Sequence, residues 1–404
     1  MERGSKPEAR PAFHHPEEFM RLHRQTILGL TGYLCIGTAS VLIPSIMPSI
    51  TSEYQAAGLS LAAIGLIFPA RALGSIAGNL LAGVGSDRLG YGRMVWLAAL
   101  LLAGSLALAG IAHPWLLFLA AFVVISATQG ALGTGINALT ADANPDGRAR
   151  ALNTLHGVYG IGAAVSPLIF GYLLQEGVAW RWMLGGTALL WLLYGLVSFL
   201  LQSSPTPQRE RRPAQLLDLS MLASAPFLAL FAIAFIYNGV AYSLLGWVAL
   251  FMQESAGFSA FFSISLISIF YVALTAGRFV CAAISERVGY GATLLGLAVG
   301  ITATYPLVVL SSSGLWVALG IFLTGLSLSG LFPTALAYGS RLYPTRSGAV
   351  AGTLNVSMTL GAMIPPVWTG VIAEWWSFQA ALGVNYVMVM GLLGVTIYLY
   401  GMDK

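Results

Sequence analysis

Charge is what this sequence lacks most. Asp, Glu, Lys and Arg make up 8% of its 404 residues, whereas soluble globular domains carry roughly 25%. Hydrophobic residues make up 57%, and this composition excludes a soluble globular protein. The sequence has two cysteines, Cys35 and Cys281, each inside an apolar run. Their placement excludes a disulfide framework and predicts that both are small packing residues.

Motifs for catalysis and for cofactors are also missing. The sequence has no Ser/His/Asp arrangement, no Cys/His metal spacing and no Gly-Lys-Ser/Thr phosphate loop. We therefore expect no enzyme activity, no metal and no cofactor. The N-terminal tail is charged and lacks a short apolar core with a small-residue cleavage site, so we expect no cleaved signal peptide. The basic run at 209–212 is interpreted as a cytoplasmic topology anchor, so no nucleic-acid partner is expected.

Long apolar runs are abundant, and they alternate with short polar segments. Each run approaches the roughly 20 residues that a membrane helix needs, and none has the period of two that a β-barrel needs. The sequence therefore predicts an all-α membrane protein with twelve transmembrane helices in two six-helix bundles. The predicted spans lie near residues 25–48, 60–83, 93–111, 115–140, 151–174, 180–201, 222–252, 259–284, 291–311, 315–340, 347–372 and 377–401.

The predicted organisation has five parts. They are an N-terminal tail (1–24), a first bundle (25–201), a linker (202–221), a second bundle (222–401) and a C-terminal tail (402–404). Sixteen of the 19 Lys and Arg residues lie in the tails or after even-numbered spans, whereas Glu53, Glu176, Glu254 and Glu374 follow odd-numbered spans. The positive-inside rule then predicts cytoplasmic termini and linker. A bacterial inner membrane or a plasma membrane is the expected location.

A charged, glycine-rich phrase occurs twice. SDRLGYGR at 86–93 and SERVGYGA at 285–292 share five of eight letters and lie 199 residues apart. Further matches keep this offset: Pro145 with Pro344, Gly162 with Gly361, Pro167 with Pro366, and Gly171 with Gly370. The halves are therefore interpreted as copies of one six-helix unit, related by an axis along the membrane normal. Such halves place a solute site between them, near the midplane.

The twelve spans and the phrase after the second span resemble the major facilitator superfamily over essentially the whole chain. The signature of this superfamily is Gly-x-x-x-Asp-Arg-x-Gly-Arg-Arg/Lys. The chain keeps Gly83, Asp87, Arg88, Gly90 and Arg93, with Tyr91 and Gly92 displacing the basic end. The resemblance implies the major facilitator fold and transport of a small-molecule solute across the lipid bilayer by alternating access. A coupling ion, H+ or Na+, and a monomeric state are expected with it.

The repeated phrase also has a physical interpretation. Gly90 and Gly92 allow a turn with positive φ, and Asp87 is poorly placed at the negative end of its own helix. The resemblance implies that Asp87 meets the start of span 11 (343–348); by symmetry Glu286 meets the start of span 5 (144–150). The alternative is an ordinary cytoplasmic turn whose basic residues follow the positive-inside rule and which has no gating role. The remaining expected members of this cytoplasmic gate are Arg148, Arg278, Arg287, Gly289 and Arg346.

A narrower resemblance covers about forty residues. Residues 129–169 are similar to spans 4 and 5 of the fucose-permease-like sugar transporters, with a glycine-rich span 4 and an LN-xx-H-xxx-GIG-xxx-P run. Proton-coupled members of that group carry carboxylates in spans 1 and 4. Here span 1 has none, and span 4 has Gly133, Thr134 and Gly135 in that region.

Arg71 is the most unusual polar residue inside a span. It lies 16 residues before Asp87, which corresponds to roughly 24 Å of helix and to mid-bilayer. No span has a carboxylate in its central part, so this guanidinium suits an anionic solute. Ser75 and Asn79 follow at i+4 and i+8 on the same face. The alternative is that Arg71 snorkels, or binds carbonyls of a kink at Pro69.

Other polar residues complete the candidate set. Arg278 resembles an arginine that organic-anion members place in span 8, but it equally suits a gate partner of Glu286 or Asp142. His156 is a coupling candidate, with a neutral, hydrogen-bonded imidazole as the alternative. Amide and aromatic side chains suit a sugar: the candidates are Gln129, Asn137, Asn238, Tyr242, Trp247 and Asn355.

The sequence therefore favours a secondary transporter of a small, sugar-like solute. The alternatives are a transporter of a small organic anion bound by Arg71 and Arg278, a drug or lipid exporter, and a receptor or scaffold that moves nothing.

Overall fold

The structure is a computed structural model, and it describes residues 16–144, 147–201 and 219–402. Its described part is helical, and twelve segments there are long and apolar enough to cross a membrane. The helices of the first half are α1 (Pro16–Ser40), α2 (Leu42–Ala56), α3 (Leu61–Gly65), α4 (Ile67–Leu89), α5 (Tyr91–Ile111), α6 (Trp115–Ala143), α7 (Arg148–Gln175) and α8 (Arg181–Leu201).

The second half repeats this order. It comprises η1 (Leu219–Ala223), α9 (Ala225–Ala256), α10 (Ala260–Val288), α11 (Tyr290–Leu310), α12 (Gly314–Leu328), α13 (Leu331–Leu342), η2 (Pro344–Arg346), α14 (Ser347–Trp375) and α15 (Phe378–Met402). Three spans are each built from two helices: α1 with α2, α3 with α4, and α12 with α13.

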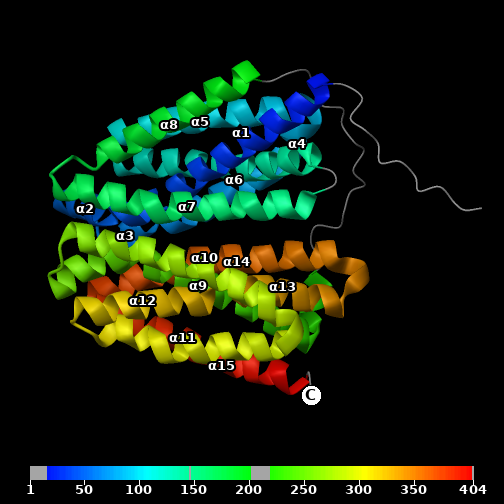
Figure 1. The fold of residues 1–404 in the computed structure, drawn as a ribbon. Helices are drawn as coiled ribbons and strands as arrows, with labels where there is room; N and C mark the ends of the chain where they lie inside the picture. The colour runs from blue at the N-terminus through cyan, green and yellow to red at the C-terminus, as the bar shows by residue number, and fades with distance from the viewer. Residues whose placement is uncertain (1–15, 145–146, 202–218, 403–404) are drawn as a thin grey trace, which may run out of the picture.

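The two halves form two bundles that lie side by side, with α7 and α2 of the first facing α10 and α9 of the second (Figure 1). The predicted fold class, twelve helices in two six-helix bundles, is confirmed. Residues 1–15 and 403–404 of the predicted tails and 202–218 of the predicted linker lie outside the described residues. Residues 16–24, which the sequence assigns to the tail, belong to α1, and the domain boundaries remain predictions.

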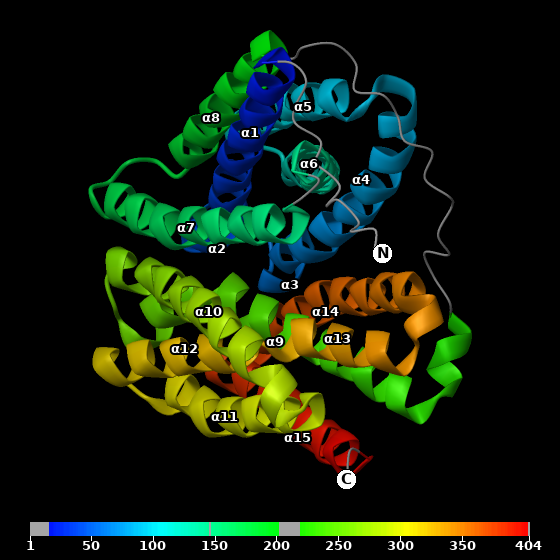
Figure 2. The ribbon, with the colours of Figure 1, turned by 45° about the vertical axis from the view of Figure 1, so that its right-hand side comes forward.

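We name the two ends of the bundles by their residues. The linker end carries the turns at 89–91 and 288–290, and the distal end carries those at 56–61 and 375–378. Figure 2 shows the linker end on the right, where α4 ends and α14 begins, and α3 near the middle of the view.

Glycines with positive φ repeat at the 199-residue offset. Gly90 (φ 76°) and Gly289 (φ 96°) form the turns at the linker end, and Gly58 (φ 88°) and Gly257 (φ 67°) form turns at the distal end. Residues other than glycine rarely adopt these φ angles. The predicted positive φ is therefore present at Gly90, whereas Gly92 lies inside α5.

Glycine also lets spans within each bundle approach closely. A Cβ at Gly162 of α7 would overlap the carbonyl oxygen of Leu34 in α1, and a Cβ at Gly361 of α14 would overlap that of Phe235 in α9. Spans 1 and 5 thus cross as spans 7 and 11 do.

Candidate functional site

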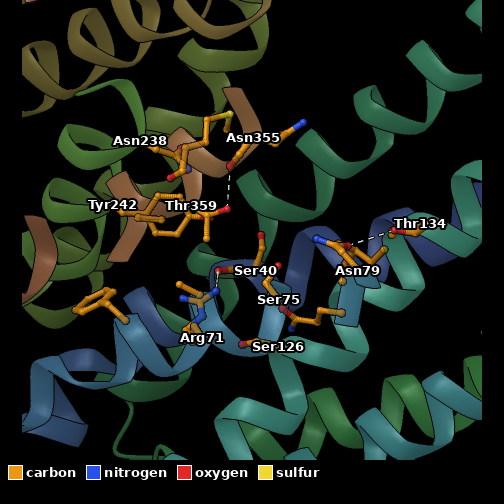
Figure 3. Close-up of a pocket in the computed structure, with 18 of the residues that line it drawn as sticks. Ser40, Arg71, Ser75, Asn79, Ser126, Thr134, Asn238, Tyr242, Asn355 and Thr359 are labelled. Carbon is orange, nitrogen blue, oxygen red and sulfur yellow. Dashed lines mark hydrogen bonds between the residues drawn. The ribbon is translucent and has the colours of Figure 1, made fainter. Parts of the chain in front are cut away.

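A polar cavity of about 730 Å³ lies between the two bundles. Residues of α1, α4, α6 and α7 line it on one side, and residues of α9 and α14 line it on the other (Figure 3). Arg71 is the only charged side chain among the described residues that line it. The cavity can therefore hold a solute with hydrogen-bonding groups and at most a small negative charge.

Arg71 is held by a backbone carbonyl. Its Nη2 donates to the carbonyl oxygen of Ser40 over 3.4 Å (Figure 3), which exceeds the usual 2.7–3.2 Å. That carbonyl is available because residue 44, whose N–H would bind it in a continuous helix, is Pro44. This carbonyl lies in span 1. Among the described residues, Arg71 makes no hydrogen bond to a carbonyl at a kink near Pro69, which was the alternative.

The guanidinium of Arg71 makes no ion pair with a described residue. A guanidinium has five N–H donors in a planar fork, and a single long bond uses one of them. The remaining donors face a cavity in which the described residues offer no carboxylate. This arrangement is suited to a carboxylate or another planar anion.

Ser40 links Arg71 to span 5. The hydroxyl of Tyr159 donates to Oγ of Ser40 over 3.0 Å, and Ser40 Oγ donates to the carbonyl of Gly37 over 2.8 Å. Tyr159 also meets Tyr271 of the other bundle edge-on, with ring centroids 6.3 Å apart. This chain of contacts fixes one wall of the cavity.

The opposite wall of the first bundle carries amides and hydroxyls. Thr134 Oγ1 donates to Asn79 Oδ1 over 3.2 Å (Figure 3). Two buried atoms, Asn137 Oδ1 and Ser126 Oγ, have no hydrogen-bond partner, although buried polar atoms in proteins are nearly always paired. Both residues line the cavity, but these two atoms are buried and do not face a solute.

The second bundle contributes amides whose donors are already engaged. Asn238 Nδ2 donates to the carbonyl of Met358 over 2.8 Å, and Asn355 Nδ2 donates to that of Ala351 over 2.8 Å. Thr359 Oγ1 donates to the carbonyl of Asn355 over 2.9 Å. The amide oxygens of Asn238 and Asn355 remain as acceptors, and Tyr242 adds a partly exposed ring and hydroxyl.

The structure brings most of the predicted binding residues into this one cavity. Those that line it are Arg71, Ser75, Asn79, Gln129, Asn137, Asn238, Tyr242 and Asn355. Trp247, Arg278 and His156 are absent from the lining. His156 meets Tyr33 edge-on with ring centroids 5.3 Å apart, and Arg278 is exposed on α10.

Trp247 has a different setting. Its indole is fully buried, donates to the carbonyl of Pro366 over 2.9 Å and packs against Phe68, with ring centroids 5.7 Å apart. Phe68 comes from the first bundle, and its ring lies so close to Gly246 that a Cβ there would be 2.5 Å away. Phe68 and Trp247 therefore close the distal side of the cavity, and Trp247 does not face a solute within it.

The predicted gate residues lie at the linker end, except Arg278. Those described with exposed side chains are Arg88, Arg93, Arg148, Glu286, Arg287 and Arg346, and Gly90 and Gly289 form the turns. Glu286 makes no hydrogen bond or ion pair with another described residue. The surroundings of Gly83 and the side chain of Asp87 lie outside what the structure describes, so the Asp87 contact remains a prediction.

The cavity also contains residues that the sequence did not single out for binding. They are Ser40, Ser126, Thr134, Tyr159, Met358 and Thr359. Ser40 had a usable signal, because a proline four residues later frees its carbonyl. Thr359 follows Asn355 by one helical turn, which places both on one face.

The fold and the cavity define a class of protein: a two-bundle helical membrane protein with a central polar cavity for a small solute. A sequence profile of the Major Facilitator Superfamily matches residues 29–366. The chain belongs to this superfamily, whose members are transporters of small solutes.

Relatives and solved structures support the assignment. The chain is 24% identical to the hexuronate transporter of Bacillus subtilis over 379 residues, covering 86% of each chain. It is 21% identical to the sodium-dependent glucose transporter 1A of Mus musculus, covering 78% of this chain and 82% of the relative.

Two solved structures share the fold. A mutant of the nucleoside transporter NupG matches with a TM-score of 0.80 at 12% identity, covering 94% of this chain and 99% of that one. A bacterial homologue of the human lysosomal transporter Spinster, inward-facing and occupied, matches with a TM-score of 0.76 at 15% identity, covering 96% and 98%.

Proposed function

We propose that the chain transports a small polyhydroxylated organic anion, of the sugar-acid type, by alternating access. The carboxylate binds the fork of Arg71, and the hydroxyl groups bind the amides and hydroxyls around it. One observation carries the proposal: the only charged side chain of the described lining is a guanidinium that makes a single long bond. The name of the Bacillus subtilis relative, a hexuronate transporter, is consistent with it.

The remaining lining supports the hydroxylated part of the cargo. Asn238 and Asn355 line the cavity, each with its amide nitrogen bonded to a backbone carbonyl and its amide oxygen left as an acceptor. Sugar hydroxyl groups can donate to these oxygens. The sugar and anion hypotheses thus combine into one cargo, because both sets of residues line the same cavity.

A neutral sugar is the second candidate, favoured by the sodium-dependent glucose transporter among the relatives. In that case Arg71 serves as a hydrogen-bond donor to hydroxyls. His156 and Arg278 lie outside the cavity lining, so a coupling role for His156 and an anion role for Arg278 are secondary to Arg71. The linker end faces the cytoplasm in this proposal, because most arginines lie there.

A thermal-shift and counterflow experiment tests the cargo. The purified protein is titrated with hexuronates and with the matching neutral hexoses, and each ligand is then tested for counterflow in liposomes. We expect hexuronates to stabilise the wild type more than hexoses do, since stabilisation follows concentration over Kd. Arg71→Gln should weaken hexuronate binding at least tenfold, because it removes a charge-assisted pair.

Arg150→Gln is the matched control. Arg150 is exposed at the linker end, so this change removes the same charge without touching the cavity, and hexuronate binding should persist. Equal binding of hexuronate by wild type and Arg71→Gln would overturn the anion proposal. Preference for the hexose would support the neutral sugar, and stabilisation by lipids or amphiphiles alone would contradict both.

A further inference from the structure

The second span begins with a helix terminus shared by both bundles. Ser60 Oγ accepts from the backbone N–H of Ala63 over 3.1 Å and forms the N-cap of α3. The neighbouring N–H, that of Ala62, donates over 3.0 Å to Oε2 of Glu374. Glu374 lies near the end of α14, in the other bundle. A side chain of span 11 thus completes the cap of span 2.

The eighth span begins in the same way. Ser259 Oγ accepts from the N–H of Phe262 over 3.2 Å and forms the N-cap of α10. The N–H of Phe261 donates over 3.1 Å to Oε1 of Gln175. Gln175 is the last residue of α7, in the first bundle. A side chain of span 5 thus completes the cap of span 8.

The two arrangements are copies. Ser60 with Ser259, Ala62 with Phe261, and Gln175 with Glu374 are each separated by 199 residues, the offset of the repeated phrase at the linker end. Both bonds therefore occupy the same place in the six-helix unit, and each crosses from one bundle to the other.

A glycine one turn earlier brings each pair of spans together. A Cβ at Gly370 would lie 3.2 Å from the carbonyl oxygen of Leu61, and a Cβ at Gly171 would lie 3.4 Å from Cα of Phe261. Each glycine precedes its acceptor by four residues, so glycine and acceptor lie on one helix face. The glycine allows the approach, and the acceptor one turn later reaches the helix terminus.

We propose that Gln175 and Glu374 form a paired distal latch, which holds the bundles together at this end and breaks when the distal end opens. The first N–H groups of a helix have no partner within the helix, so opening removes a bond that only water can replace. The carboxylate of Glu374 also accepts a charge-assisted hydrogen bond, which is stronger than the bond that a neutral amide oxygen accepts. Glu374 is therefore the stronger half of the latch.

The distal latch has the geometry predicted for the linker end, with the helix roles exchanged. There, Asp87 and Glu286 at the ends of spans 2 and 8 are expected to meet the starts of spans 11 and 5. At the distal end, the acceptors lie on spans 5 and 11 and the donors on spans 8 and 2. Each of the two helix pairs thus carries one acceptor for each end.

Double electron–electron resonance on the full-length protein in nanodiscs tests the latch. One spin label is placed at Ala57 and one at Ser312, both exposed at the distal end of opposite bundles. Cys35 and Cys281, which are buried, are replaced by alanine. The measured quantity is the population of molecules with a long distance between the labels divided by the population with a short distance, in the absence of cargo.

Glu374→Ala should raise this ratio about tenfold, as the loss of one charge-assisted bond predicts. Gln175→Ala should raise it less, about two- to threefold, and the double variant should raise it by about the product. Glu374→Gln should raise it less than Glu374→Ala does, because Gln175 shows that an amide oxygen serves at the matched position, although the charge is lost.

Glu176→Ala is the control, because it removes an exposed carboxylate beside Gln175 that makes no hydrogen bond with another described residue. Wild-type distances in folded Glu374→Ala and Gln175→Ala, judged by unchanged melting temperatures, would overturn the latch. An equal shift from Glu176→Ala would also overturn it.

The inference rests on the alternating-access part of the proposed function and not on its cargo. Shifted distances without any stabilising solute would leave the latch standing and contradict the proposed cargo. Hexuronate counterflow together with unshifted distances would support the proposed cargo and contradict the latch.

Discussion

The side-chain amide of Asn238 donates to the backbone carbonyl of Met358 over 2.8 Å. The corresponding carbonyl in the first bundle, 199 residues earlier, is that of Tyr159, and Gly37 lies against it so closely that a Cβ would overlap. Spans 1 and 5 therefore meet through glycine where spans 7 and 11 meet through an amide. The two bundles share a crossing and differ in its chemistry, which makes the cavity between them asymmetric.

The glycines of these crossings should be intolerant of alanine. Gly361→Ala places a Cβ on the carbonyl of Phe235, so spans 7 and 11 must separate, at a cost of about 1–3 kcal/mol. Gly383→Ala in α15 is the control, because nothing lies within 4 Å of its Cβ position and alanine favours a helix. Melting temperatures in detergent should fall for the first variant and hold or rise for the second.

The turns at the linker end should require glycine. Gly90 (φ 76°) and Gly289 (φ 96°) adopt angles that cost a side chain about 1–3 kcal/mol. Gly90→Ala and Gly289→Ala should each lower the melting temperature by a few degrees. Gly104→Ala is the control, because a Cβ there lies in open space on α5, and it should leave the melting temperature unchanged. An equal fall in the melting temperature of this variant would show that the φ angles are not the cause.

Removing the proline break in span 1 should weaken cargo binding. Pro44→Ala supplies an N–H that can donate to the carbonyl of Ser40, so Arg71 loses that bond. Cargo must then order the guanidinium itself, and its apparent affinity should fall severalfold. Pro48→Ala, one turn later in α2, is the matched control; thermal-shift titration with hexuronate measures both. Equal affinities in the two variants would contradict the role of the Ser40 carbonyl.

The two acids at the linker end should differ in strength. The first copy of the repeated phrase keeps Arg93, whereas the second has Ala292 at the matching position. We therefore expect Asp87→Asn to slow counterflow severalfold more than Glu286→Gln. Initial rates in liposomes measure the difference, and equal or reversed effects would contradict the asymmetry.

The sequence predicts much of the fold because each span can be identified from its own residues. Apolar runs set the spans, and the 199-residue repeat sets their pairing into two bundles. Arg71, Ser75 and Asn79 share one helix face, so their common lining follows from helical periodicity.

Contacts between bundles were less predictable. The setting of Trp247 depends on Phe68 from the other bundle, and no local pattern encodes that meeting. From the sequence, Glu374 is only an acid after an odd-numbered span, because its donor lies 312 residues away. The breaks after Ser40, Gly65 and Leu328 have a local signal, because Pro44, Pro69 and Pro333 follow four or five residues later and supply no N–H.

The bond between Arg71 and the Ser40 carbonyl couples cargo loading to the break in span 1. A carboxylate on the remaining donors shares the guanidinium with this carbonyl, and α2 begins two residues later. From that break α2 runs to the distal end and packs against α9. Cargo in the cavity would therefore be connected, through Arg71, to the stretch of backbone that helps to seal it.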